Sequence, residues 1–178
     1  MAQSPAVGSS GDGLDQSKVS TMSSHPFRQA AQFLLGVPTD GIHHTLGRML
    51  TLAQATPLCF VAVTGPDAGE AMSVLWRKGY DRVEAARRAT CRAADEQSDV
   101  LLVVGCSTVA DARAAAASTM TMLRPGGALV IDAGAFLDQE PRRALCEDLR
   151  ALGLEVEAQA YLSAELLATR PFSKREAA

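Results

Sequence analysis

The sequence predicts a single α/β domain with a three-layer, doubly wound and mainly parallel sheet. Two observations indicate this fold. Apolar runs recur as strand candidates at residues 58–65, 99–105 and 128–134, and segments with helical periodicity separate them. The runs are nearly continuous rather than alternating, which is typical of parallel strands buried on both faces.

Composition excludes several classes of protein. The chain has 178 residues, of which 47% are hydrophobic and 21% charged, as in an ordinary soluble domain. A net charge of -3 lacks the basic footprint of a general nucleic-acid binder, and an aromatic content of 4% disfavours base stacking. No apolar stretch approaches the roughly 18 residues of a membrane helix. We therefore expect neither a nucleic-acid partner nor a membrane partner.

The cysteines show no metal or disulfide pattern. None belongs to a CxxC pair, and none lies at a zinc-ligand spacing from a histidine or another cysteine. We expect reduced thiols in a cytoplasmic protein, with no metal site. The four residues are Cys59, Cys91, Cys106 and Cys146.

The chain before the alternating pattern divides into two parts. Residues 1–24 are rich in serine and glycine without an apolar period, which predicts a disordered tail. Residues 25–57 show two amphipathic segments, at 25–36 and 39–56, which predict leading helices. The main domain is expected over residues 58–173.

The first half of the main domain alternates strand with helix. Asp67 and Glu70 have the spacing of a capping box at the start of a helix. The predicted elements are a strand at 58–65, a helix at 67–79, a strand at 81–86 and a short helix at 87–97.

The second half continues the pattern and closes with two strands. Thr108 and Asp111 again suit the cap positions of a helix. Pro125, Gly126 and Gly127 predict a turn that ends this helix and reverses the chain into the next strand. The predicted elements are a strand at 99–105, a helix at 108–123, a strand at 128–134, a helix at 138–153, and two closing strands at 154–162 and 164–172.

The segment "MLRPGGALVID", residues 122–132, resembles the LxPGGxLxI segment that leads into the fifth strand of class I S-adenosylmethionine-dependent methyltransferases. Residues 153–172 resemble that family's antiparallel sixth and seventh strands. The resemblance covers roughly residues 41 to 172. It implies a methyltransferase-like fold with an antiparallel C-terminal strand pair. Only 14 residues separate Glu84 from Asp99, so we expect one edge strand of the family to be absent.

The resemblance implies a cofactor site at the turn after the first strand, where the chain reads "AVTGPDAGE". Gly65 and Gly69 are present, but Pro66 and Asp67 stand where the family has a second glycine. A proline lacks an N–H donor, and an aspartate adds negative charge beside a ligand that carries a carboxylate. The motif is therefore degenerate. The alternative interpretation is a plain strand-to-helix turn with an N-cap.

Acidic residues further along bear on the same site. The family binds the ribose hydroxyls with an acidic residue at the end of its second strand. Glu84 lies 19 residues after Gly65, and Asp81 is the other candidate. The alternative for Glu84 is an exposed charge at a strand end. Asp95 suits a contact with the adenine edge or a solvated helix end.

Candidate acceptor-binding residues follow the fourth and fifth strands of the family pattern. They are Cys106, Ser107 and Asp132, although strand-end packing also accounts for the first two. The Asn-Pro-Pro-Tyr tetrapeptide of amino-methylating enzymes is missing, as are a nucleophile elbow and a Walker A loop. His43 and His44 are adjacent, so a helix points them about 100° apart and they do not form a two-histidine metal site. No catalytic residue is identified.

The sequence thus predicts a methyltransferase-like protein with a degenerate cofactor loop. Under this hypothesis it is weakly active or non-catalytic and works as a regulatory or interaction module for an unknown protein partner. The alternative is an active methyltransferase that uses S-adenosylmethionine on an unidentified small-molecule acceptor. A nicotinamide-dependent oxidoreductase fits the closing strand pair poorly. An enzyme should have a cavity over Gly65 with Glu84 on its rim, whereas side chains should fill that space in a module.

Overall fold

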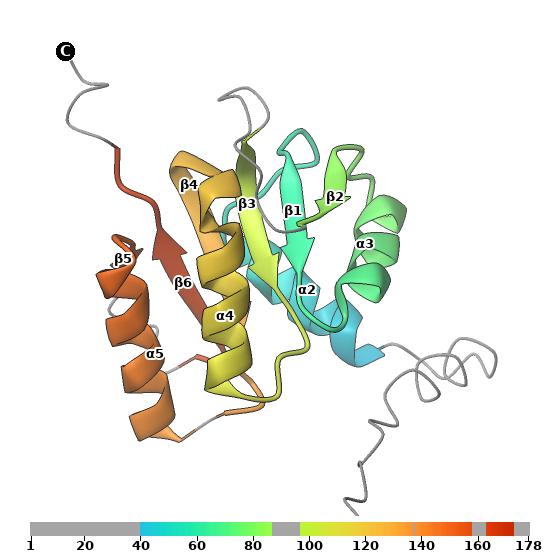
Figure 1. The fold of residues 1–178 in the computed structure, drawn as a ribbon. Coiled ribbons are helices and arrows are strands. Elements are labelled where there is room, and N and C mark those ends of the chain that lie inside the picture. Colours follow the sequence, from blue (N-terminus) through green and yellow to red (C-terminus); the bar gives the residue numbers. More distant parts are fainter. Residues whose placement is uncertain (1–39, 87–96, 137, 158–162, 173–178) are drawn as a thin grey trace, which may run out of the picture. The chain divides into compact units, whose positions relative to one another are not determined.

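The computed structural model describes residues 40–86, 97–136, 138–157 and 163–172. Within them, helices lie on both sides of one six-stranded sheet (Figure 1). The helices are α2 (Asp40–Leu52), α3 (Ala68–Arg77), α4 (Val109–Thr119), the short 3₁₀ helix η2 (Met120–Met122) and α5 (Gln139–Ala151). The strands are β1 (Val61–Thr64), β2 (Val83–Ala85), β3 (Ser98–Val103), β4 (Leu123–Asp132), β5 (Glu155–Val156) and β6 (Glu165–Thr169).

The sheet confirms the predicted fold class. Its strand order is β2-β1-β3-β4-β6-β5. The first four strands are parallel, β6 runs antiparallel to β4, and β5 runs antiparallel to β6. Among the described residues, β2 is the last strand on its side of the sheet. The predicted tail at 1–24 and the first leading helix at 25–36 lie outside the described residues, as does nearly all of the short helix expected at 87–97.

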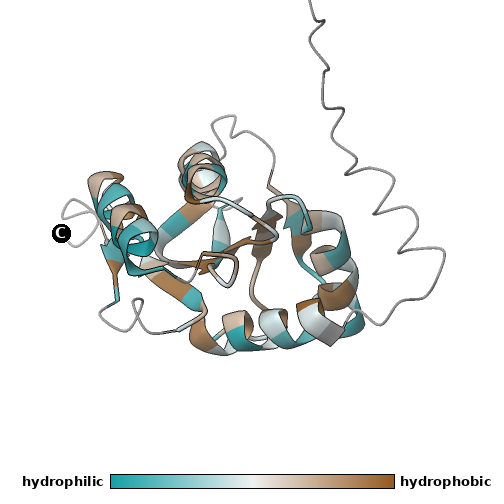
Figure 2. Ribbon diagram, turned by 90° about the horizontal axis from the view of Figure 1, so that it is seen from below, coloured by the Kyte–Doolittle hydropathy of each residue, from teal (hydrophilic) through white to brown (hydrophobic). Residues whose placement is uncertain are grey.

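Alternating side chains of the strands build one apolar cluster on each face of the sheet. On the central strand β3, Leu101 and Val103 belong to the cluster that α4 and α5 cover. Val100 and Leu102 belong to the cluster that α2 and α3 cover. Figure 2 shows the helices on both sides of largely hydrophobic strands. No helix among the described residues is long and apolar enough to cross a bilayer.

The predicted turn at residues 124–127 is wrong. Helix α4 ends at Thr119, and β4 already begins at Leu123, so Pro125, Gly126 and Gly127 lie inside the strand. The pairing between β3 and β4 jumps at this point, from Ser98 opposite Leu123 to Val100 opposite Ala128. The segment is therefore a bulge at the start of β4.

Proline and glycine suit this bulge for physical reasons. Proline has no N–H for a strand ladder and is tolerated where the ladder is interrupted. Gly126 has a φ of +76°, which side chains other than glycine rarely adopt, and its N–H donates to the Arg170 carbonyl at 2.7 Å. A Cβ on Gly126 would lie 2.3 Å from the Phe172 ring. Glycine at position 126 therefore allows the segment after β6 to pack closely on the bulge.

The two predicted helix caps differ in outcome. Thr108 caps α4 as expected, since its hydroxyl accepts from the Asp111 N–H at 3.1 Å and donates to the Asp111 carboxylate at 2.7 Å. Asp67 occupies the N-cap position of α3, but its side chain makes no capping hydrogen bond. The predicted capping box of Asp67 and Glu70 is therefore wrong, because the Asp67 carboxylate points elsewhere.

Candidate functional site

The loops that follow β1 and β3 touch each other through their backbones. The Val104 N–H donates to the Thr64 carbonyl at 2.9 Å. Gly65 follows with a φ of +107°, and a Cβ at this position would lie 2.0 Å from the Val104 carbonyl oxygen. Loop-to-loop packing therefore requires glycine at position 65.

The carboxylate of Asp67 lies against the second of these loops. A Cβ on Gly105, whose φ is +72°, would lie 2.3 Å from the Asp67 Oδ2 atom. This placement explains why Asp67 does not cap α3. It also puts a negative charge directly beside the carboxyl end of β3.

Three of the predicted site residues gather around this point. Cys106 is 4% exposed, and burial raises the pKa of its thiol to about 11, an effect reinforced by the carboxylates of Asp111, Asp132 and Asp67. The carboxyl ends of three parallel strands thus bring together Asp67 and Cys106, from the loops after β1 and β3, and Asp132, the last residue of β4. Ser107 follows Cys106 and is exposed. A raised thiol pKa opposes a role for Cys106 as a nucleophile.

We expect Cys106 to react with alkylating reagents at least about ten times more slowly than the half-buried Cys59 at pH 8. At that pH a thiol with a pKa of about 11 is ionised in roughly one molecule in a thousand. Mass spectrometry of timed iodoacetamide reactions measures both rates, with Cys106→Ala as the control that identifies the peptide. Equal rates for the two cysteines would contradict the buried, acidic surroundings of Cys106.

Two other predicted cofactor residues have different surroundings. Gly69 is the second residue of α3, and a Cβ there would meet no atom within 4 Å. Glu84 is the half-buried middle residue of β2 and pairs with Ala62, three positions before Gly65. Asp81 precedes β2 and so lies at the amino ends of the parallel strands, whereas Gly65 lies at their carboxyl ends. The ribose contact of Glu84 stays a prediction, and Asp95 lies outside the described residues.

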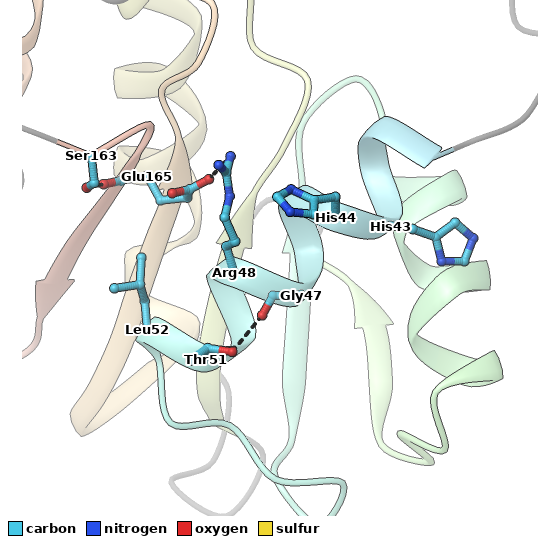
Figure 3. Close-up of a pocket in the computed structure, with 8 residues that line it drawn as sticks. All are labelled: His43, His44, Gly47, Arg48, Thr51, Leu52, Ser163 and Glu165. Carbon is cyan, nitrogen blue, oxygen red and sulfur yellow. Dashed lines mark hydrogen bonds and ion pairs between the residues drawn. The ribbon is translucent and has the colours of Figure 1, made fainter.

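A cavity of about 600 Å³ lies beside α2 and the start of β6 (Figure 3). Its lining contains no residue of β1 or β2. Figure 3 shows the imidazoles of His43 and His44 pointing in different directions, and the described residues hold no group of three metal-ligating side chains. The cavity is lined by His43, His44, Gly47, Arg48, Thr51, Leu52, Ser163 and Glu165.

A chain of polar contacts runs past this cavity from α5 to α2. Arg142 of α5 is 3% exposed and donates to the Ser163 carbonyl, while the Ser163 hydroxyl donates to the Glu165 carbonyl. Glu165, the first residue of β6, is 4% exposed and forms an ion pair with Arg48 of α2. Asp132 is the cross-strand partner of Glu165 in β4. These charges therefore lie at the carboxyl edge of the parallel strands, where such sheets bind ligands.

The candidate site residues predicted from the sequence did not include Arg48, Arg142 or Glu165. One signal was available for Glu165, which opens the otherwise apolar run "ELLA". A carboxylate in a buried strand needs a partner, because an unpaired buried charge is costly. The partner itself was not identifiable, since Arg48 precedes every strand of the sheet and Glu165 begins the last.

Comparison with known proteins supports the architecture. No protein-family model matches the chain, and no curated protein matches it in sequence. One similar structure is a chain from a Haloferax volcanii complex, which contains the Trm112 methyltransferase activator and a protein described as a methyltransferase. Its TM-score is 0.52 at 13% identity, and the match covers 84% of this chain and 96% of that one. An O-methyltransferase family protein from Burkholderia thailandensis is similar at 0.50 and 15% identity, covering 85% and 62%.

A third similar structure is the S-adenosylmethionine-bound amino pentose methyltransferase from Micromonospora echinaspora, at a TM-score of 0.46 and 15% identity, covering 81% of this chain and 96% of that one. At these identities the likeness concerns the fold. The fold assignment depends on the two structures with TM-scores of 0.52 and 0.50, and the sheet order and the antiparallel β6 and β5 agree with it. The chain has the fold of the class I S-adenosylmethionine-dependent methyltransferases.

Proposed function

We propose that this chain is a methyltransferase-like protein whose cofactor site has degenerated. It binds S-adenosylmethionine weakly or not at all and acts as a regulatory or interaction module for a protein partner. The observation that carries this proposal is the position of the Asp67 carboxylate, packed against Gly105 at the carboxyl end of β3.

The packing of the two glycines supports the proposal. Glycine in a nucleotide-binding turn normally allows the ligand to approach the backbone closely. Here the space beside the α-carbon of Gly65 holds the Val104 carbonyl, and the space beside Gly105 holds Asp67. Contacts within the chain therefore account for both glycines without a ligand.

The charges around the turn point in the same direction. Asp67, Asp111 and Asp132 all lie near Cys106, so a ligand carboxylate placed at this turn would meet like charges. The cavity beside α2 is lined by neither Gly65 nor Glu84. It is therefore not the cavity over the glycine turn that an active enzyme was expected to have.

Calorimetric titration with S-adenosylmethionine and S-adenosylhomocysteine, with NAD as the control ligand, tests the proposal. We expect no binding heat from the unmodified chain below about 1 mM ligand, equivalent to a binding free energy weaker than about -4 kcal/mol. Micromolar binding that is lost in Glu84→Ala would contradict the proposal and support the alternative of an active methyltransferase.

The variant Asp67→Gly tests whether the Asp67 carboxylate is the reason for weak binding of S-adenosylmethionine. It restores a second glycine in the turn and removes the carboxylate from Gly105, so we expect affinity for S-adenosylmethionine to increase at least about tenfold. Asp138→Gly is the matched control, because Asp138 is also an N-cap aspartate without a side-chain capping bond. An equal change in both variants would show that the Asp67 carboxylate is not responsible.

A further inference from the structure

We propose that the cavity beside α2 is a binding site for a small organic anion, whose carboxylate or phosphate group contacts the guanidinium of Arg48. The proposal goes beyond the module function and does not depend on whether S-adenosylmethionine binds. The site is built by α2 and the start of β6. The loop after β1, which carries Gly65 and Asp67, contributes no lining residue.

The cavity has the volume of a small-molecule site and opens widely to solvent. Its volume of about 600 Å³ falls within the range of about 300–1,000 Å³ that is typical of ligand pockets. Gly47 and Leu52 add carbon surface between its polar and charged residues. Such a lining suits a ligand with a compact apolar body and one charged group.

The accessible charge in the cavity is positive. Glu165 is 4% exposed and forms an ion pair with Arg48 of α2. Arg48 itself is 46% exposed. A guanidinium has five N–H donors in a planar fork, so the pair with Glu165 leaves donors free to bind an oxyanion. Both residues line the cavity, but a ligand that enters it meets more of the Arg48 side chain than of the Glu165 carboxylate.

A second guanidinium, that of Arg142, lies beside Ser163. Arg142 is 3% exposed, its Nε atom has no hydrogen-bond partner, and none of the carboxylates in the described ranges forms an ion pair with it. Asp132, the cross-strand neighbour of Glu165, instead accepts from the Gly134 N–H at 3.1 Å and does not line the cavity. Arg142 therefore adds a second positive charge beside Ser163, two residues before Glu165, although it does not itself line the cavity.

Helix α2 also places a second donor beside Arg48. His44 and Arg48 are four residues apart, so they lie on the same face of the helix. Figure 3 shows the His44 imidazole on the Arg48 side and the His43 imidazole turned away. Thr51 contributes less, because its hydroxyl donates to the Gly47 carbonyl at 2.9 Å. The ring N–H of His44 is therefore the expected second contact to the anion.

Benzoate and benzylamine test the sign of the site, since they share an aromatic body and carry opposite charges. Binding to the full chain is followed by NMR shifts of the histidine side chains. We expect benzoate to bind at least about ten times more tightly than benzylamine. Inorganic phosphate is titrated as a second probe. If phosphate also binds at Arg48, the site accepts phosphate esters as well as carboxylates. If benzoate binds and phosphate does not, the site is specific for carboxylates.

The double variant Arg48→Gln/Glu165→Gln removes both charges of the ion pair and leaves no unpaired buried carboxylate. We expect it to weaken benzoate binding at least about tenfold, whereas Arg113→Gln on α4 leaves binding unchanged. Benzoate binding that survives in the double variant would overturn the proposal. So would the absence of benzoate binding, or tighter binding of benzylamine that is lost in Glu165→Gln. A parallel titration with S-adenosylmethionine tests the proposed function separately, so a negative benzoate result can be told apart from tight cofactor binding.

Discussion

Replacing Gly65 with alanine is expected to lower the free energy of unfolding by at least about 3 kcal/mol. Two costs add. A φ of +107° is strained for any residue with a Cβ, and that Cβ would lie 2.0 Å from the Val104 carbonyl oxygen. The obstructing atom belongs to the backbone, which the pairing of β1 with β3 holds in place. Urea denaturation followed by far-UV circular dichroism measures the change.

Gly69→Ala is the matched control for this prediction. It lies four residues away in the same turn-and-helix segment, has no positive φ, and would place its Cβ in open space. We expect it to be neutral or to stabilise the protein by up to about 1 kcal/mol, because alanine favours a helix over glycine. A small effect at both positions would mean that the loops after β1 and β3 do not pack as described.

The elements that the sequence predicted well are those with a local signal. The apolar runs gave the central strands, and the amphipathic segment at 39–56 gave α2, which spans Asp40–Leu52. The spacing of Thr108 and Asp111 gave the cap of α4, because both partners of that cap belong to the same turn. The two closing strands were predicted from the sequence, the resemblance to methyltransferases implied their antiparallel arrangement, and they are present as β5 and β6.

The errors have a common physical cause, which is contact with distant segments. Pro125 and Gly126 have the composition of a turn, but pairing with Arg170 and close packing of Phe172 make the segment part of β4. Asp67 has the position of a capping residue, but its carboxylate lies against Gly105 of another loop. Local rules describe what a residue favours, and tertiary packing decides between the options.

Some residues of the candidate site were predictable from the sequence and others were not. Sequence reasoning named Asp67, Cys106 and Asp132 from their places at strand ends, and the structure brings these three together. The ion pair of Arg48 with Glu165 joins a helix that precedes the sheet to its last strand. No spacing rule connects two such residues, so only the fold reveals the cavity that they line.

That ion pair gives the second large effect. Arg48→Gln is expected to lower the free energy of unfolding by about 2–4 kcal/mol at pH 7, because it leaves the carboxylate of Glu165 buried without its cation. Glu165→Gln alone should cost only about 1 kcal/mol, since Arg48 is 46% exposed and water can solvate it. We therefore expect Arg48→Gln, which leaves a buried carboxylate unpaired, to destabilise the protein more than Glu165→Gln, which leaves an exposed guanidinium unpaired.

The double variant separates electrostatics from packing. Adding Glu165→Gln to Arg48→Gln should recover more than half of the lost stability, because no charge then stays buried alone. Arg113→Gln is the control for an exposed pair: Arg113 and Asp148 are 3.4 Å apart and 61% and 28% exposed, so its loss should cost at most about 1 kcal/mol. If Arg48→Gln costs no more than Arg113→Gln, Glu165 does not depend on Arg48. If the double variant recovers nothing, the Arg48 side chain stabilises α2 through packing rather than charge. Recovery together with the asymmetry of the single variants would establish a buried carboxylate at the edge of β6 that holds Arg48 in position across the cavity.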